Sequence, residues 1–188
     1  MKTDRQGQLQ DLFVFVLLVG IGVAGRWGQP EWCFTPTAAA AIFAGWYFSH
    51  WAIAVLVPLS ILGISDLLLP AYDSIPVLIS TYFIMTLPVG LGRLQRSSHS
   101  RALSAARWAL FAFVPATAFY IVTNFTVWAF QSSYEKSLAG LGQCYWAAVP
   151  FYRWMLTGDL FYVCVLLACF ALAGERIFAT SRAAVKPA

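Results

Sequence analysis

The stretch 108-WALFAFVPATAFYIVTNFTVWAF-130 decides the fold class, because it is apolar and uncharged over the length that a helix needs to cross a bilayer. The rest of the chain shares this character. Of its 188 residues, 60% are hydrophobic and only 11% are charged, and the mean hydropathy is +0.70. This composition is typical of an integral membrane protein and excludes a soluble domain.

Other apolar runs of the chain predict further helices, and one boundary between them stays open. Residues 36–69 fit either two helices or one kinked helix, because only the faint turn signal "SHW" at 49–51 interrupts them. The first run has the basic start of a signal peptide but a poor cleavage site, so it is interpreted as a helix. The expected helices cover about 12–25, 36–48, 51–69, 75–92, 108–130 and 144–173.

The distribution of Lys and Arg favours six membrane spans. With six, the N-terminus, the 93–107 loop and the C-terminus lie on one side, and they hold two, four and three of the 12 basic residues. The sequence therefore predicts a single all-α domain over 1–188. It is a polytopic six-transmembrane-helix bundle with both termini in the cytoplasm, in the bacterial cytoplasmic (inner) membrane. The pI near 9.0 reflects this topology and not nucleic-acid binding.

Polar side chains at helical spacing mark the faces that turn away from lipid. Thr117, Tyr120, Asn124 and Trp128 recur at intervals of three and four, which predicts one polar-aromatic stripe. Across the next helix, Tyr145, Tyr152 and Asp159 are spaced by seven.

Two carboxyl groups in or beside apolar runs are the strongest functional candidates, because a carboxylate inside a membrane is costly unless it is paired or lines a polar cavity. They are Asp66, near the outer end of the third helix, and Asp159, inside the sixth. The alternative role for Asp159 is a helix–helix contact. The predicted ligand-binding residues are Asp66, Asn124, Trp128, Tyr145, Tyr152 and Asp159.

Catalytic and cofactor motifs give no support for an enzyme. The chain has no H-E-x-x-H and no G-x-S-x-G, so no metal or hydrolase site is expected. Asp73 and Asp159 do not fit a paired-aspartate protease, because Asp73 falls in an outer loop. The "GIGVAG" at 20–25 lies inside an apolar run, where glycines allow close helix packing and do not bind a nucleotide. No cofactor is expected.

Two of the four cysteines, Cys33 and Cys144, fall on the predicted outer side. In an oxidising periplasm they can form a disulfide, and two free thiols are the alternative. The choice between the two depends on whether the first outer loop folds over the start of the sixth helix.

A resemblance rests on the stretches "FTPTAAAAIFAGWYF", "ISDLLL", "VTNFTVWAF" and "GLGQCYWAAVPFYRWMLTGDLFY". Together they resemble an uncharacterised family of bacterial six-helix membrane proteins. That family is similar in plan to the substrate-binding S components of energy-coupling-factor (ECF) vitamin transporters. The resemblance implies outer loops that cap a vitamin-like ligand and a small-residue face that docks a transmembrane coupling subunit. The candidates for docking are Gly20 with Ala24, or Ala40 with Ala44.

Three functions from different classes follow. The first hypothesis is a small-solute-binding membrane subunit of a transporter, whose partners are the lipid bilayer, a small-molecule ligand and a coupling subunit. The second is a structural or assembly subunit that packs its polar stripes against another membrane protein. An intramembrane enzyme is third. Finding a bound small molecule would distinguish the first hypothesis from the second.

Overall fold

The computed structural model describes residues 2–96 and 101–173, and all regular structure within them is helical. A two-residue turn at 85–86 separates the fourth helix from the fifth, and Pro88 lies in the first turn of the fifth. These two segments therefore form one kinked unit. The helices are α1 (Lys2–Trp27), α2 (Thr37–Tyr47), α3 (Trp51–Ser65), α4 (Ile75–Ile84), α5 (Leu87–Arg96), α6 (Arg101–Phe130) and α7 (Leu138–Ala173).

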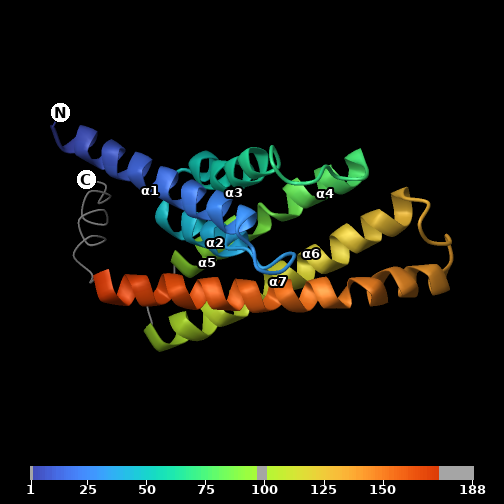
Figure 1. The fold of residues 1–188 in the computed structure, drawn as a ribbon. Coiled ribbons are helices and arrows are strands. Elements are labelled where there is room, and N and C mark those ends of the chain that lie inside the picture. Colours follow the sequence, from blue (N-terminus) through green and yellow to red (C-terminus); the bar gives the residue numbers. More distant parts are fainter. Residues whose placement is uncertain (1, 97–100, 174–188) are drawn as a thin grey trace.

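Successive helices run in alternating directions, except that α5 continues in the direction of α4 (Figure 1). The start of α1, the end of α5, the start of α6 and the end of α7 lie toward one end of the molecule. The connections 66–74 and 131–137 lie toward the other end, and the connection 28–36 folds back against the middle of α7. This arrangement is consistent with a chain that passes back and forth between two ends of the molecule, as the sequence predicts. Arg176, Arg182 and Lys186, and the segment 97–100, lie outside the described residues.

The apolar run over residues 36–69 forms two helices and not one kinked helix. α2 ends at Tyr47, and the backbone is extended at Phe48 and His50 before α3 begins. Both helices are shorter than the membrane spans predicted from the sequence. At 1.5 Å per residue, the 11 residues of α2 correspond to about 17 Å and the 15 residues of α3 to about 23 Å. α2 can be short because every side chain from Thr37 to Gly45 is buried in protein and does not face lipid.

The tightest packing in the described part of the chain joins α2 to α5. A Cβ added at Gly45 would lie 2.0 Å from the carbonyl oxygen of Val89, and one added at Gly92 would lie 1.9 Å from that of Ile42. Real Cβ atoms do not approach so closely, so the two backbones meet directly through these glycines. Of the glycines in "GIGVAG", Gly22 has the expected packing role, because it faces the side chain of Ile61 on α3, and Gly25 meets Pro36. Nothing lies within 4 Å of a Cβ at Gly20.

Among the residues that the structure describes, three helical segments are long and apolar enough to cross a membrane: Arg5–Trp27, Ile75–Leu94 and Ala112–Phe130. Large apolar side chains on each of them are exposed, for example Phe13, Phe83 and Phe125. In water such surfaces would be unfavourable, whereas in a bilayer they face lipid. The chain is therefore a helical membrane protein.

Candidate functional site

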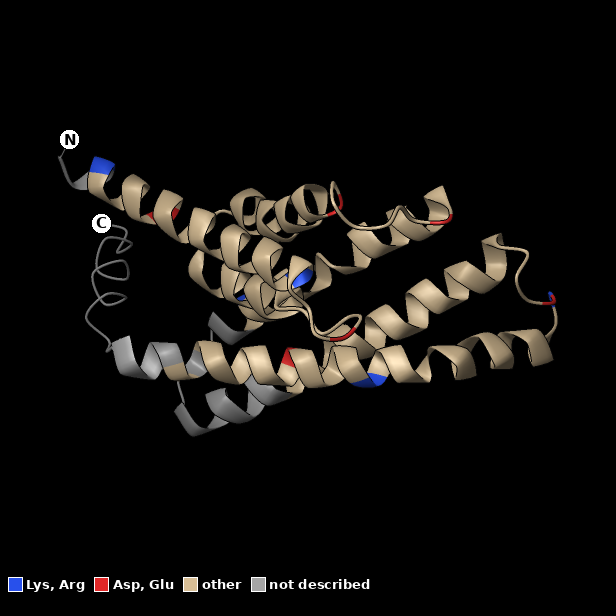
Figure 2. Ribbon diagram, viewed as in Figure 1, with Lys and Arg blue, Asp and Glu red and all other residues tan. Residues whose placement is uncertain are grey.

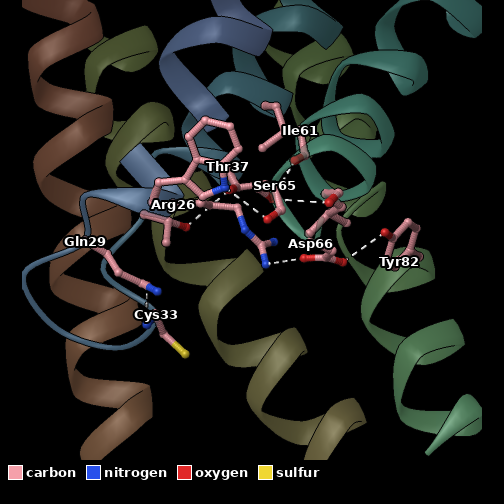
Figure 3. A network of polar contacts seen from close by, with 11 residues as sticks. Arg26, Gln29, Cys33, Thr37, Ile61, Ser65, Asp66 and Tyr82 are labelled. Carbon is pink, nitrogen blue, oxygen red and sulfur yellow. Dashed lines mark hydrogen bonds and ion pairs between the residues drawn. The ribbon is translucent and has the colours of Figure 1, made fainter. Parts of the chain in front are cut away.

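An ion pair joins the C-terminal ends of α1 and α3 (Figure 3). The Arg26 guanidinium Nη2 lies 2.8 Å from Asp66 Oδ1, and the Tyr82 hydroxyl on α4 donates to Asp66 Oδ2 at 2.9 Å. The Trp27 indole N–H also donates to the Ser65 carbonyl at 3.0 Å. Both carboxylate oxygens of Asp66 thus have partners within the protein. Asp66, predicted to bind ligand, here ties three helices together.

The loop that follows α3 adds Tyr72 to this ion pair. Burial raises the pKa of the Tyr72 hydroxyl; the charge of Arg26 opposes that rise and the charge of Asp66 adds to it. The tyrosine hydroxyl therefore stays protonated at physiological pH and adds no charge to the ion pair.

Residues 28–36, which we call the covering segment, pack against the middle of α7. The Phe34 ring lies 5.8 Å from that of Phe161 and 5.6 Å from that of Tyr162. A Cβ added at Gly158 would lie 3.1 Å from Phe34 Cα, so a residue without a side chain allows this approach. Cys33 has a φ of 71°, which is unusual for a residue other than glycine.

The Cys33 side chain points into the bundle, where it packs with Leu62, Met85, Ala116 and Met155 from α3, the α4–α5 turn, α6 and α7. Burial raises the pKa of its thiol to about 11; Arg26 lowers that pKa and Asp159 raises it. The covering segment meets α7 at Gly158, the residue that precedes Asp159.

Asp159 is the one charged side chain among the fully buried residues that the structure describes, at 2% exposure. Along α7 the acidic colour appears once, near the middle of the helix (Figure 2), and Asp159 is the only Asp or Glu between Leu138 and Ala173. Its Oδ2 has no hydrogen-bond partner. A buried carboxyl oxygen without a partner is costly, so this atom needs a proton, a donor or a cation that the protein itself does not supply.

The predicted stripe on α6 pairs with α7 instead of facing open space. The Thr117 and Tyr152 hydroxyls lie 3.0 Å apart, and the Tyr120 hydroxyl donates to the Tyr145 carbonyl at 2.7 Å. Asn124 Nδ2 donates to the Tyr120 carbonyl, one turn back on its own helix, at 2.8 Å. The structure therefore places Tyr145 and Tyr152 in contacts between α6 and α7, whereas the Asn124 amide bonds within its own helix.

Trp128 lies apart from this group, at the tip of the α6–α7 hairpin. Its indole N–H donates to the Glu135 carbonyl at 2.8 Å, and the Lys136 ammonium donates to the carbonyls of Trp128 and Gln131. A cation at these carbonyls stabilises the C-terminal end of α6. Trp128 thus closes the hairpin. It does not contribute to a site with Asp159.

Cys33 and Cys144 are free thiols in the structure, so they do not form the predicted disulfide and the alternative of two free thiols holds. The Cys144 thiol donates to the Asn124 carbonyl at 3.4 Å, within the contact between α6 and α7. Cys33 instead packs beside Met155 in the cluster under the covering segment. Each sulfur therefore has its own packing environment, because the covering segment meets α7 near Gly158 and not near its start.

The raised pKa of Cys33 predicts slow alkylation. In a Cys144→Ser, Cys164→Ser, Cys169→Ser background, iodoacetamide should modify Cys33 about a hundredfold more slowly at pH 8 than an ordinary thiol. A rise from 9.0 to about 11 lowers the thiolate fraction by two powers of ten. The rate, measured by mass spectrometry, should increase up to pH 10. A plateau below pH 9 would contradict the buried placement of the thiol.

The same assay tests the contact between the covering segment and α7. Gly158→Val should displace Phe34 and raise the alkylation rate of Cys33, because the added side chain meets backbone at 3.1 Å. Gly142→Val on the same helix is the matched control, since nothing lies within 4 Å of a Cβ there.

A family model described as "Family of unknown function (DUF6580)" matches residues 6–183. Comparison with curated proteins and with solved structures gave no match. The family match agrees with the resemblance to an uncharacterised family.

Proposed function

We propose that the chain, which belongs to this family of unknown function, is a small-solute-binding membrane subunit of a transporter. The observation that carries the proposal is Asp159, a carboxyl group with 2% exposure whose Oδ2 has no partner. Intramembrane carboxyl groups that serve only to join helices are satisfied by a neighbouring helix, as Asp66 is. One left without a partner is a functional candidate by default.

The proposed binding centre lies beneath the covering segment, beside Asp159. Phe34 meets α7 at Gly158, the residue before Asp159, and Cys33 packs against the cluster that includes Met155. Tyr152 belongs to the same cluster. Of the predicted site residues, this retains Asp159 and Tyr152 as ligand-binding candidates. Asn124, Trp128 and Tyr145 shape the hairpin, and Asp66 ties the C-terminal ends of α1 and α3 to Tyr82 on α4.

We further propose a topology of six spans, with both termini in the cytoplasm of a bacterial inner membrane. The alternating helix directions support it, and so do the acidic residues Glu31, Asp73 and Glu135 in the three connections opposite the basic loop. A plan like that of an ECF S component would place the covering segment on the outer side. Of the two small-residue pairs considered for docking a coupling subunit, only Gly20 and Ala24 are exposed; Ala40 and Ala44 are buried.

The test is extraction of bound small molecules. Wild-type protein purified in mild detergent should carry a compound that mass spectrometry finds at lower occupancy in Asp159→Asn. Losing a charged partner in a buried site lowers affinity by roughly tenfold or more. Glu31→Gln is the matched control, because it also removes one carboxylate but from an exposed position in the covering segment. Wild-type protein that carries no compound in excess of a detergent blank would defeat the proposal.

A structural or assembly subunit is the second candidate, favoured by the α6–α7 hairpin. The 30 and 36 residues of these helices correspond to about 45 and 54 Å, more than the roughly 30 Å of hydrocarbon in a bilayer. Large apolar side chains near the hairpin tip are nevertheless exposed: Phe130 at 65%, Leu138 at 87% and Trp146 at 79%. Apolar surface beyond the bilayer fits contact with a partner protein. Co-purification of a stoichiometric partner without any bound compound would favour this candidate.

A further inference from the structure

An exposed arginine lies on α7 at the depth of an apolar span. Arg153 is exposed, and the hydroxyl of the adjacent Tyr152 lies 3.0 Å from that of Thr117 on α6. Thr117 belongs to Ala112–Phe130, which is long and apolar enough to cross a membrane. Arg153 is therefore level with the interior of that segment. An exposed guanidinium in hydrocarbon is costly, so this side of α7 needs a partner other than lipid.

The Arg153 side chain does not reach water by extending along its own helix. Side chains on a helix tilt toward its N-terminus, and the N-terminus of α7 lies at the hairpin with α6. In that direction the apolar segment of α6 continues for 13 residues from Thr117 to Phe130, about 20 Å, which is more than an arginine spans. The guanidinium lies 5.6 Å from the centroid of the adjacent Trp154 ring, a contact that leaves its charge in place.

The covering segment carries an opposite charge at a similar depth. The Phe34 N–H donates to the Glu31 carbonyl at 3.1 Å, and Phe34 Cα would lie 3.1 Å from a Cβ at Gly158. Gly158 is five residues from Arg153, or about 7.5 Å along α7 and about 140° around it. Glu31 is exposed, and within residues 2–96 and 101–173 neither Glu31 nor Arg153 forms an ion pair. The two charges thus lie on different sides of α7.

An exposed strip of α7, which we call the α7 face, separates Arg153 from the covering segment. At about 100° per residue, Thr157 lies about 40° and Phe161 about 80° around the helix from Arg153, toward the covering segment. The Phe161 ring contacts that of Phe34, which marks the edge of the strip. The α7 face consists of Gln143, Pro150, Thr157 and Phe161, and all four are exposed.

We propose that the α7 face is the contact surface of a homodimer, in which Arg153 of each copy pairs with Glu31 of the other. Two copies with the same topology are related by a two-fold axis along the membrane normal, and rotation about that axis keeps each residue at its depth. Arg153 can therefore meet only groups level with it, and Glu31 is such a group. Because the two charges flank the strip on opposite sides, the surface is self-complementary. An axis that passed over Arg153 itself would instead bring two like charges together.

Exchanging the two charges tests the pairing. Förster transfer between donor- and acceptor-labelled full chains in lipid vesicles, at several protein-to-lipid ratios, measures the dissociation constant of the dimer. Arg153→Glu and Glu31→Arg should each raise it by about tenfold or more, because like charges then face each other. The double variant Arg153→Glu, Glu31→Arg should return it to within about threefold of the wild-type value. Arg5→Glu, which reverses an exposed charge on α1, is the matched control and should leave it unchanged.

Cross-linking tests the same surface with both charges intact. In a Cys164→Ser, Cys169→Ser background, Thr157→Cys should form a disulfide between two copies under mild oxidation in vesicles, because the axis crosses the strip that holds Thr157. The product should have twice the 20.8 kDa of the chain. Phe13→Cys, at an exposed apolar position on α1, is the control and should remain uncross-linked. If either charge reversal fails to insert, this experiment and the comparison of the double variant with wild type decide.

Three results would overturn the inference. The first is wild-type transfer that stays at the level of unassociated chains at every protein-to-lipid ratio. The second is a double variant that associates no better than the single ones. The third is Thr157→Cys that cross-links to another protein, or not at all. The α7 face lies on the surface of the bundle whereas Asp159 is 2% exposed, so these outcomes are independent of whether the chain binds a solute.

Discussion

Gly92→Ala is expected to lower the free energy of unfolding by about 3 kcal/mol or more, because the new Cβ would lie 1.9 Å from the Ile42 carbonyl oxygen. The same Cβ would also meet the backbone nitrogen of Trp46 at 2.9 Å, so no side-chain rotation can relieve the overlap. α2 and α5 would have to move apart along a fully buried contact. At 2–4 °C per kcal/mol, the Tm measured in detergent should fall by roughly 10 °C.

A second glycine and a control make this prediction specific. Gly45→Ala should have a similar effect, since its Cβ would lie 2.0 Å from the Val89 carbonyl. Gly63→Ala on α3 should be neutral or slightly stabilising, because nothing lies within 4 Å of its Cβ and alanine favours a helix over glycine by up to about 1 kcal/mol. Equal Tm values for Gly92→Ala and Gly63→Ala would contradict the backbone contact between α2 and α5.

The pairing of α2 with α5 shows what local sequence patterns miss in this fold. The apolar runs predicted where helices begin and end to within a few residues for α2 and the start of α3, because burial and length are encoded locally. They did not predict which helices meet. Gly45 and Gly92 are far apart in the sequence, and a glycine in an apolar helix has the same appearance whether it faces lipid or a carbonyl group. Nor could apolarity alone distinguish α2, whose residues from Thr37 to Gly45 are buried, from a lipid-facing span.

The candidate site was predictable only in part, for a related reason. Asp159 stood out because a carboxyl group in an apolar run is costly anywhere in a bilayer. The stripe that includes Asn124 has the same spacing as a pocket lining, yet its amide is satisfied by the Tyr120 carbonyl one turn away. The regular spacing of polar residues identifies a helix face, but it does not show what that face contacts. Arg26 was overlooked as a site residue, although its place at the end of the first apolar run, on the same side as Asp66, was a usable signal.

Arg26→Met is expected to be the most destabilising change in the polar network, at about 3 kcal/mol. The substitution leaves the Asp66 carboxylate, with a side chain only 18% exposed, without its cation. Tyr82→Phe removes one hydrogen bond to the same carboxylate and should cost about 1.5 kcal/mol. Arg5→Gln removes an exposed cation from α1 and should change stability by less than about 0.5 kcal/mol. Chemical or thermal unfolding in detergent measures all three.

The double variant Arg26→Met, Asp66→Asn distinguishes an ion pair from two independent contacts. If the two side chains stabilise the protein chiefly through each other, the double variant should be more stable than the sum of the single effects predicts, by a coupling energy of about 1–3 kcal/mol. Removing both charges also removes the buried carboxylate that Arg26→Met alone would strand. Additive effects would mean that Arg26 stabilises the protein without Asp66.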